Sequence, residues 1–136
     1  SRIVLPVDSS LETRQKVGFA SRLAHLFDAE IFVLSLYSSG YEGVQIRVDG
    51  YTKQVLGFLE DEGLKYSHHK RKADNITDTT IEFAKEIDAN LITIMTEQEK
   101  TTANLWLGPY AHQMVNHSPI PVLSIKPEGY MISLQR

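Results

Sequence analysis

The chain has 136 residues, of which 42% are hydrophobic and 23% charged, with a formal net charge of -3 and no cysteine. This composition is that of one globular domain, and its acidic balance argues against bulk binding to nucleic acid or anionic membranes. Disulfides and thiol catalysis are excluded, and no apolar run approaches the roughly 20 residues that span a bilayer, so we expect a cytoplasmic protein without nucleic-acid or membrane contacts.

Five short apolar or extended runs alternate along the chain with four stretches of helical periodicity. The runs cover residues 3–7, 31–36, 65–72, 91–95 and 122–125. Apolar residues recur at helical spacing within residues 17–27, 51–59, 81–87 and 111–115. Gly63 is a plausible stop for the second helix, and Asn75 or Thr77 could cap the third. Continuous apolar strands alternating with helices predict right-handed βαβ units and a parallel sheet.

The third run, residues 65–72, is too polar for the centre of a sheet. Its basic stretch Lys70-Arg71-Lys72 is typical of an edge strand, where charge discourages stray pairing. Placing this run at one edge predicts the strand order 3-2-1-4-5. The fold class is therefore α/β, a three-layer α/β/α doubly wound sheet of five parallel strands. We assign this domain to residues 1–127 and a C-terminal tail to residues 128–136.

The fifth run forms the opposite edge, although it is apolar. Val122, Leu123 and Ile125 would leave an exposed apolar edge, which is prone to aggregation unless it is covered. Either the tail at residues 128–136 folds over it or a second copy of the chain pairs with it. We expect a homodimer through this last strand.

The predicted order places a topological switch point between the first and fourth runs. Ligands of open α/β sheets bind in the crevice beyond the carboxyl ends of the strands at such a point. Two segments must face it, namely Asp8 to Ser10 and the loop from Thr96 to Leu107. A binding site in this protein is therefore expected at the end of the first and fourth strands.

Both ends of the domain resemble the universal stress protein family. Residues 3–10 read Ile-Val-Leu-Pro-Val-Asp-Ser-Ser, which is similar to the first strand of that family. Residues 108–123, which end in Pro-Ile-Pro-Val-Leu, resemble its last helix and strand even more closely. The resemblance covers nearly the whole chain, although the middle matches only in pattern. It implies a stress-response domain, and many members of the family bind ATP.

The ATP-binding members carry Gly-x2-Gly-x9-Gly-Ser/Thr after the fourth strand, and this motif is altered here. Gly108 matches the third glycine, whereas Met95, Gln98 and Pro109 occupy the other three positions. Glycines allow the backbone to approach phosphate oxygens, and Pro109 has neither an N–H nor a hydroxyl to donate. The sequence therefore predicts a non-enzymatic regulatory domain that acts through dimerisation or partner binding and needs no cofactor.

The alternative is a module that binds ATP or another adenine nucleotide in the crevice. The resemblance implies that Asp8 lies near the adenosine and that Leu36 lines the adenine slot, while Lys100 and Thr101 offer a cation and a hydroxyl. The candidate ligand-binding residues are Pro6, Asp8, Leu36, Lys100, Thr101 and Gly108. A purely structural role competes for Asp8, which is placed to order the turn before the first helix.

Other functions find little support in the sequence. His68 and His69 are neighbours on a strand and point to opposite faces, while His112 and His117 are too widely spaced to share a helix face. We therefore expect no metal site, since zinc requires three or four converging ligands. A phosphotransfer domain would need more carboxylates than Asp8 after the first strand. No Ser-His-Asp arrangement or paired carboxylates indicate a hydrolase, so we assign no catalytic residues.

Overall fold

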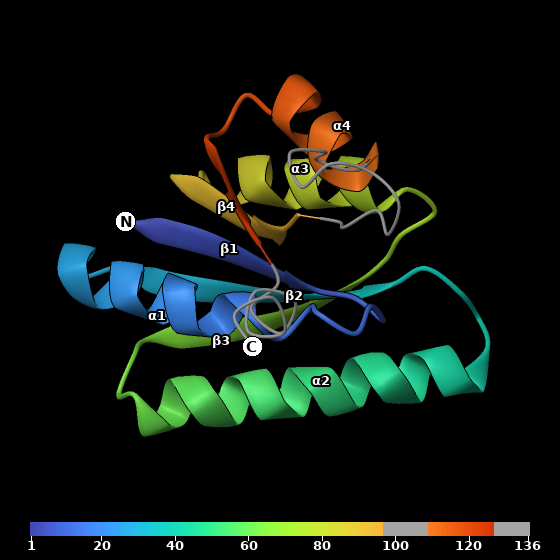
Figure 1. The fold of residues 1–136 in the computed structure, drawn as a ribbon, viewed down its shortest axis with the longest axis horizontal. Coiled ribbons are helices and arrows are strands. Elements are labelled where there is room, and N and C mark those ends of the chain that lie inside the picture. The colour runs from blue at the N-terminus through green and yellow to red at the C-terminus, as the bar shows by residue number, and fades with distance from the viewer. Residues whose placement is uncertain (97–108, 127–136) are drawn as a thin grey trace, which may run out of the picture.

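The computed structural model describes residues 1–96 and 109–126. The elements within them are β1 (Arg2–Val7), α1 (Lys16–Phe27), β2 (Glu30–Tyr37), α2 (Glu42–Asp61), β3 (Tyr66–Lys72), α3 (Ile76–Glu86), β4 (Leu91–Met95), α4 (Pro109–His117) and β5 (Val122–Ile125). Strands and helices alternate throughout, as the sequence predicts. Figure 1 shows a central sheet with α1 and α2 on one face and α3 and α4 on the other.

All strand pairs are parallel, and the sheet order is β3-β2-β1-β4-β5. The predicted order 3-2-1-4-5 and the three-layer α/β/α architecture are thus confirmed. In the central pair Ile3 lies opposite Ile31, and on the other side of β1 it lies opposite Leu91. The chain reverses its winding direction between β1 and β4, which places the switch point where the sequence predicts it.

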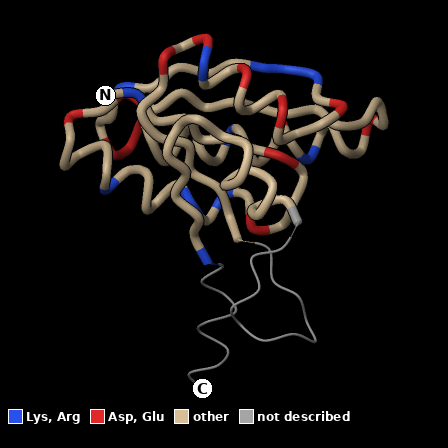
Figure 2. Tube along the Cα trace, turned by 90° about the horizontal axis from the view of Figure 1, so that it is seen from above, with Lys and Arg blue, Asp and Glu red and all other residues tan. Residues whose placement is uncertain are grey.

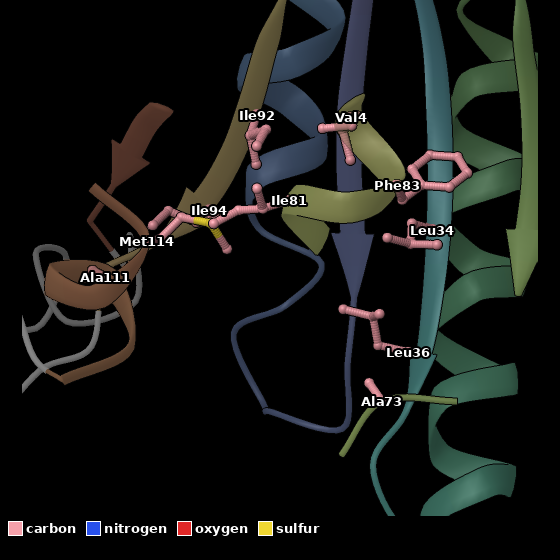
Figure 3. Packing of buried hydrophobic residues seen from close by; sticks show 11 residues of the cluster. Val4, Leu34, Leu36, Ala73, Ile81, Phe83, Ile92, Ile94, Ala111 and Met114 are labelled. Atoms are coloured by element: carbon pink, nitrogen blue, oxygen red, sulfur yellow. The ribbon is translucent and has the colours of Figure 1, made fainter. Parts of the chain in front are cut away.

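The sheet separates two apolar cores, because successive residues of a strand point to opposite faces. Val4, Leu34 and Ile92 pack with α3 and α4 in the core that Figure 3 shows. Ile3 and Ile31 pack with α1 and α2 on the other face. Burial on both faces explains why β1, β2 and β4 are continuous apolar runs.

Two helix ends carry cap residues that the sequence predicts. The Asn75 side chain accepts a 3.0 Å hydrogen bond from the backbone N–H of Asp78 and caps the start of α3. Gly63 follows the end of α2 with a φ of +67°, the left-handed conformation that glycine adopts without steric cost. Of the two caps that the sequence offers for α3, Asn75 is therefore the one used.

The two edges of the sheet differ in polarity. The residues of β3 are half-buried or exposed and almost all polar, while Val122 and Leu123 of β5 are half-buried and Ile125 is buried. Figure 2 shows residues of both charge signs distributed along the described chain. Within the described residues, no helix combines the length and apolar character needed to cross a membrane.

Candidate functional site

The turn that follows β1 is held in place by Asp8. One carboxylate oxygen, Oδ1, accepts hydrogen bonds from the backbone N–H of Ser10 at 2.8 Å and from its hydroxyl at 2.6 Å. The Asp8 backbone N–H donates to Oγ1 of Thr13 at 3.1 Å. This aspartate therefore orders the turn at the switch point, and its half-buried carboxylate remains at the carboxyl end of β1.

Lys16, the first residue of α1, lies directly beside this turn. Its side chain is buried, with a residue exposure of 3%, and its Nζ donates to Oγ1 of Thr13 at 3.1 Å. Burial lowers the pKa of Lys16 from 10.5 to about 8, and the negative charge of Asp8 opposes this shift. Nothing in the sequence pattern marked this lysine, because a lysine in a first helical turn is ordinarily exposed.

Two further predicted residues lie at the same end of the sheet. Pro6 is buried in β1, and Leu36 near the end of β2 is only 1% exposed. Leu36 lies on the α3 and α4 side, near Ala73, as Figure 3 shows. Pro6 points to the same side because it is two residues after Val4. Pro6, Asp8 and Leu36 are thus brought together at the carboxyl ends of β1 and β2.

The other side of the switch point is formed where β4 ends. Met95 is the last residue of β4 and is buried, and Thr96 follows it. The Thr96 hydroxyl forms a hydrogen bond with that of Ser124, and its N–H donates to the carbonyl of Ile125 at 2.8 Å. The remaining predicted site residues, Lys100, Thr101 and Gly108, lie outside the described residues.

A pocket that the sequence did not predict lies one strand away from the switch point. It has a volume of about 570 Å³ and opens at the carboxyl ends of β2 and β3. Its walls include Tyr37, Gln45, Asp49, Lys70, Arg71 and Lys72. The Tyr37 hydroxyl donates to the Asp49 carboxylate, and burial together with this bond raises the pKa of Tyr37 to about 12. The basic stretch of β3 is the part of this pocket that the sequence analysis singled out, and there it indicated an edge strand whose charge discourages stray pairing.

The neighbouring histidines of β3 point to opposite faces, as predicted. His68 Nε2 lies 2.8 Å from Oγ of Ser35 on the α2 side. His69 lies between the rings of Phe32 and Phe83 on the α3 side, with centroid distances of 5.8 and 5.1 Å. In the part of the chain that the structure describes, no group of three or more His, Asp or Glu side chains could hold a metal ion.

The model of the Universal stress protein family matches residues 1–126. The chain belongs to the universal stress protein family. No curated protein matches it in sequence.

Solved structures of universal stress proteins have the same fold. A universal stress protein from Archaeoglobus fulgidus is 24% identical with a TM-score of 0.79, over 92% of this chain and 98% of that one. A structure of the Archaeoglobus fulgidus universal stress protein in complex with dAMP is 22% identical with a TM-score of 0.74, over 92% and 97%. A universal stress protein in complex with cAMP is 18% identical with a TM-score of 0.75, over 93% and 97%.

Proposed function

We propose that this universal stress protein is a non-enzymatic regulatory domain whose crevice binds an adenine nucleoside monophosphate rather than ATP. The observation that carries the proposal is the joint position of Pro6, Asp8 and Leu36 at the carboxyl ends of β1 and β2, beside the switch point. The half-buried carboxylate of Asp8 suits a ribose, which needs a hydrogen-bond acceptor, and the apolar residues Pro6 and Leu36 beneath it suit the neighbourhood of a base. The two similar structures that contain dAMP and cAMP also support a monophosphate ligand.

The altered phosphate motif explains the preference for a short phosphate chain. A triphosphate depends on glycine amides along the loop after β4, and this sequence retains only Gly108 of the four motif positions. Met95, at the position of the first glycine, belongs to β4 and is buried. A monophosphate needs fewer such contacts. The protein is thus still a regulatory domain, as the sequence predicts. It differs from that prediction in binding a nucleotide with one phosphate group.

Calorimetric titration of the purified chain with AMP, dAMP, cAMP, ADP and ATP tests this function. We expect the monophosphates to bind more tightly than ATP. Asp8→Ala should weaken the binding of AMP and adenosine about tenfold, because a charged acceptor for the nucleoside is lost. Asp61→Ala, at the exposed end of α2, is the matched control and should bind as the wild type does. Equal or tighter binding of ATP, or no binding of any nucleotide at millimolar concentration, would refute the proposal.

We further propose that the domain forms a homodimer through β5. The carbonyl oxygens of Pro121 and Ile125 accept hydrogen bonds from the N–H groups of Ile92 in β4 and of Thr96 just after it. The alternate backbone groups, at Val122 and Ser124, therefore point away from the sheet. These unpaired N–H and C=O groups form an open strand edge, beside the half-buried Val122 side chain, that a second copy can extend by pairing with it.

The oligomeric state in solution tests this contact. Val122→Pro removes an outward N–H at the first strand position, where proline is tolerated, and should give a monomer in light scattering after size-exclusion chromatography. Val122→Thr keeps the N–H and the β-branched shape, and it should remain dimeric. A monomeric wild type, or a Val122→Pro variant that stays dimeric, would exclude this interface.

A further inference from the structure

Lys16 occupies a position from which its charge reaches the switch point. Helix α1 begins after the carboxyl end of β1 and packs against both β1 and β4, on the face of the sheet that Figure 1 shows it covering. As its first residue, Lys16 therefore lies at the carboxyl end of these strands. The bonds from Lys16 Nζ and from the Asp8 backbone N–H converge on one atom, Thr13 Oγ1, each with a length of 3.1 Å.

The ammonium group of Lys16 lacks an adequate counter-charge in the folded chain. Its single hydrogen-bond acceptor among the described residues is the neutral, fully buried hydroxyl of Thr13. The nearest acidic partner, Asp8, forms no ion pair with it within 4 Å, and the Asp8 Oδ1 atom is already bonded to Ser10. A buried cation in this state is costly, so its retention indicates an anion that the folded protein acquires by binding.

We infer that Lys16 is a buried cationic anchor for the phosphate group of the ligand that binds at the switch point. This inference rests on the proposed function. Lys16 would stabilise the phosphate in place of the glycine amides that the loop after β4 lacks. Direct contact is not required, because charges interact strongly across the poorly screened interior, and Thr13 lies between the ammonium and the turn. The chemical class of the ligand is an adenine nucleotide with one phosphate group, and adenosine alone should gain nothing from Lys16.

The charged groups around Lys16 give the inference a defined dependence on pH. Asp8, in the turn after β1, is the group whose charge acts on Lys16. Glu12 and Arg14 lie in the turn that precedes Lys16, and Arg14 Nη1 donates to Gln54 Oε1. Above about pH 8 Lys16 loses its proton, and AMP binding should then weaken. AMP remains a dianion in this range, because the second pKa of a phosphate monoester is about 6.

A pair of variants tests the anchor by calorimetry. Lys16→Met keeps the length of the side chain and removes its charge, and Lys53→Met makes the same change at an exposed position of α2. We expect Lys16→Met to weaken AMP binding about tenfold at pH 7 while adenosine binding is unchanged, because the attraction between the ammonium charge and the phosphate is lost. Lys53→Met should affect neither ligand. An unchanged AMP affinity in Lys16→Met, or an equal loss for AMP and adenosine, would overturn the inference.

A measurement on the wild-type chain keeps the inference testable if Lys16→Met does not fold. NMR titration of the ¹³Cε signal of Lys16 reports its pKa directly. Saturating AMP should raise this pKa by about one unit, which corresponds to a tenfold stronger binding to the charged form, whereas adenosine should leave it in place. If adenosine and AMP both bind and neither moves the Lys16 pKa, the anchor is wrong while the proposed function stands. If neither binds, the proposed function fails first.

Discussion

The Oγ atom of Ser35 in β2 lies 2.8 Å from Nε2 of His68 in β3, and the same hydroxyl lies 2.6 Å from Oγ1 of Thr52 in α2. Ser35 is fully buried and Thr52 nearly so. One serine hydroxyl therefore joins two neighbouring strands and the helix that covers them. This network fastens the otherwise polar edge strand β3 to the centre of the sheet, and it explains how a strand with few apolar residues keeps its place.

Removing the Ser35 hydroxyl should lower the free energy of unfolding more than removing the Thr52 hydroxyl. Ser35→Ala leaves both Thr52 and His68 without their partner, and we expect a loss of about 2 kcal/mol in the free energy of unfolding, since a buried unsatisfied polar group costs about 1 to 3 kcal/mol. Thr52→Val leaves the bond from Ser35 to His68 in place and should cost about 1 kcal/mol. Urea denaturation measures both changes. A larger loss in Thr52→Val would show that Ser35 is not the centre of the network.

The same contact makes stability depend on the charge of His68. Burial, Lys70 and His69 lower the pKa of His68 below 6.5, while Asp49 opposes them. The unfolded chain therefore binds a proton more readily at this site, so His68 favours the fold above pH 6.5 and this contribution is lost as the pH falls through the lowered value. His68→Gln, which can still bond Ser35, should reduce the stability lost between pH 7.5 and pH 5.5.

Urea denaturation at the two pH values measures this difference. His117→Gln, at the exposed end of α4, serves as a surface control and should retain the acid sensitivity of the wild type. If His68→Gln loses as much stability on acidification as the wild type does, the neutral form of His68 is not favoured by the fold.

The aromatic packing under β3 gives a third prediction. Phe83 of α3 is 2% exposed and its ring lies 5.1 Å from that of His69, with the guanidinium of Arg71 at 5.3 Å. Phe83→Ala should cost about 3 to 5 kcal/mol, because it removes a buried ring and leaves a cavity. Phe58→Ala, at a position that is 39% exposed, should cost clearly less. Thermal unfolding followed by circular dichroism compares them, and equal losses would contradict the assignment of Phe83 to the core.

The sequence predicted the sheet because hydrophobic patterning records burial. The apolar runs of β1, β2 and β4 and the polar run of β3 were enough to order the strands, since an edge strand tolerates charge and a central one does not. The opposite orientations of His68 and His69 followed from the period of a strand alone. These features depend on short-range geometry, which a sequence displays directly.

The environment of individual side chains could not be predicted from hydrophobic patterning. In the sequence Lys16 is an ordinary polar residue near the start of a helix, whereas in the structure it is buried and bonded to Thr13 in the turn after Asp8. The pocket between Tyr37 and Lys70 likewise depends on how far α2 lies from the end of β3. Such distances are set by tertiary packing, for which residue spacing along the chain gives no signal.

The buried charge of Lys16 should lower the stability of the folded protein at neutral pH. With a pKa of about 8 in the folded chain and 10.5 as the ordinary value, the unfolded state binds the extra proton between these limits. Stability should therefore rise with pH across this window, and below about pH 8 the folded state carries the full free-energy cost of the buried charge, on the order of 3 kcal/mol. Lys16→Met should be more stable than the wild type by up to this amount at pH 7, and the gap should narrow by pH 9.5. Urea denaturation at both pH values measures it, with Lys53→Met as the exposed control. A Lys16→Met variant that is no more stable than the wild type at pH 7 would mean that the ammonium is solvated or paired in solution.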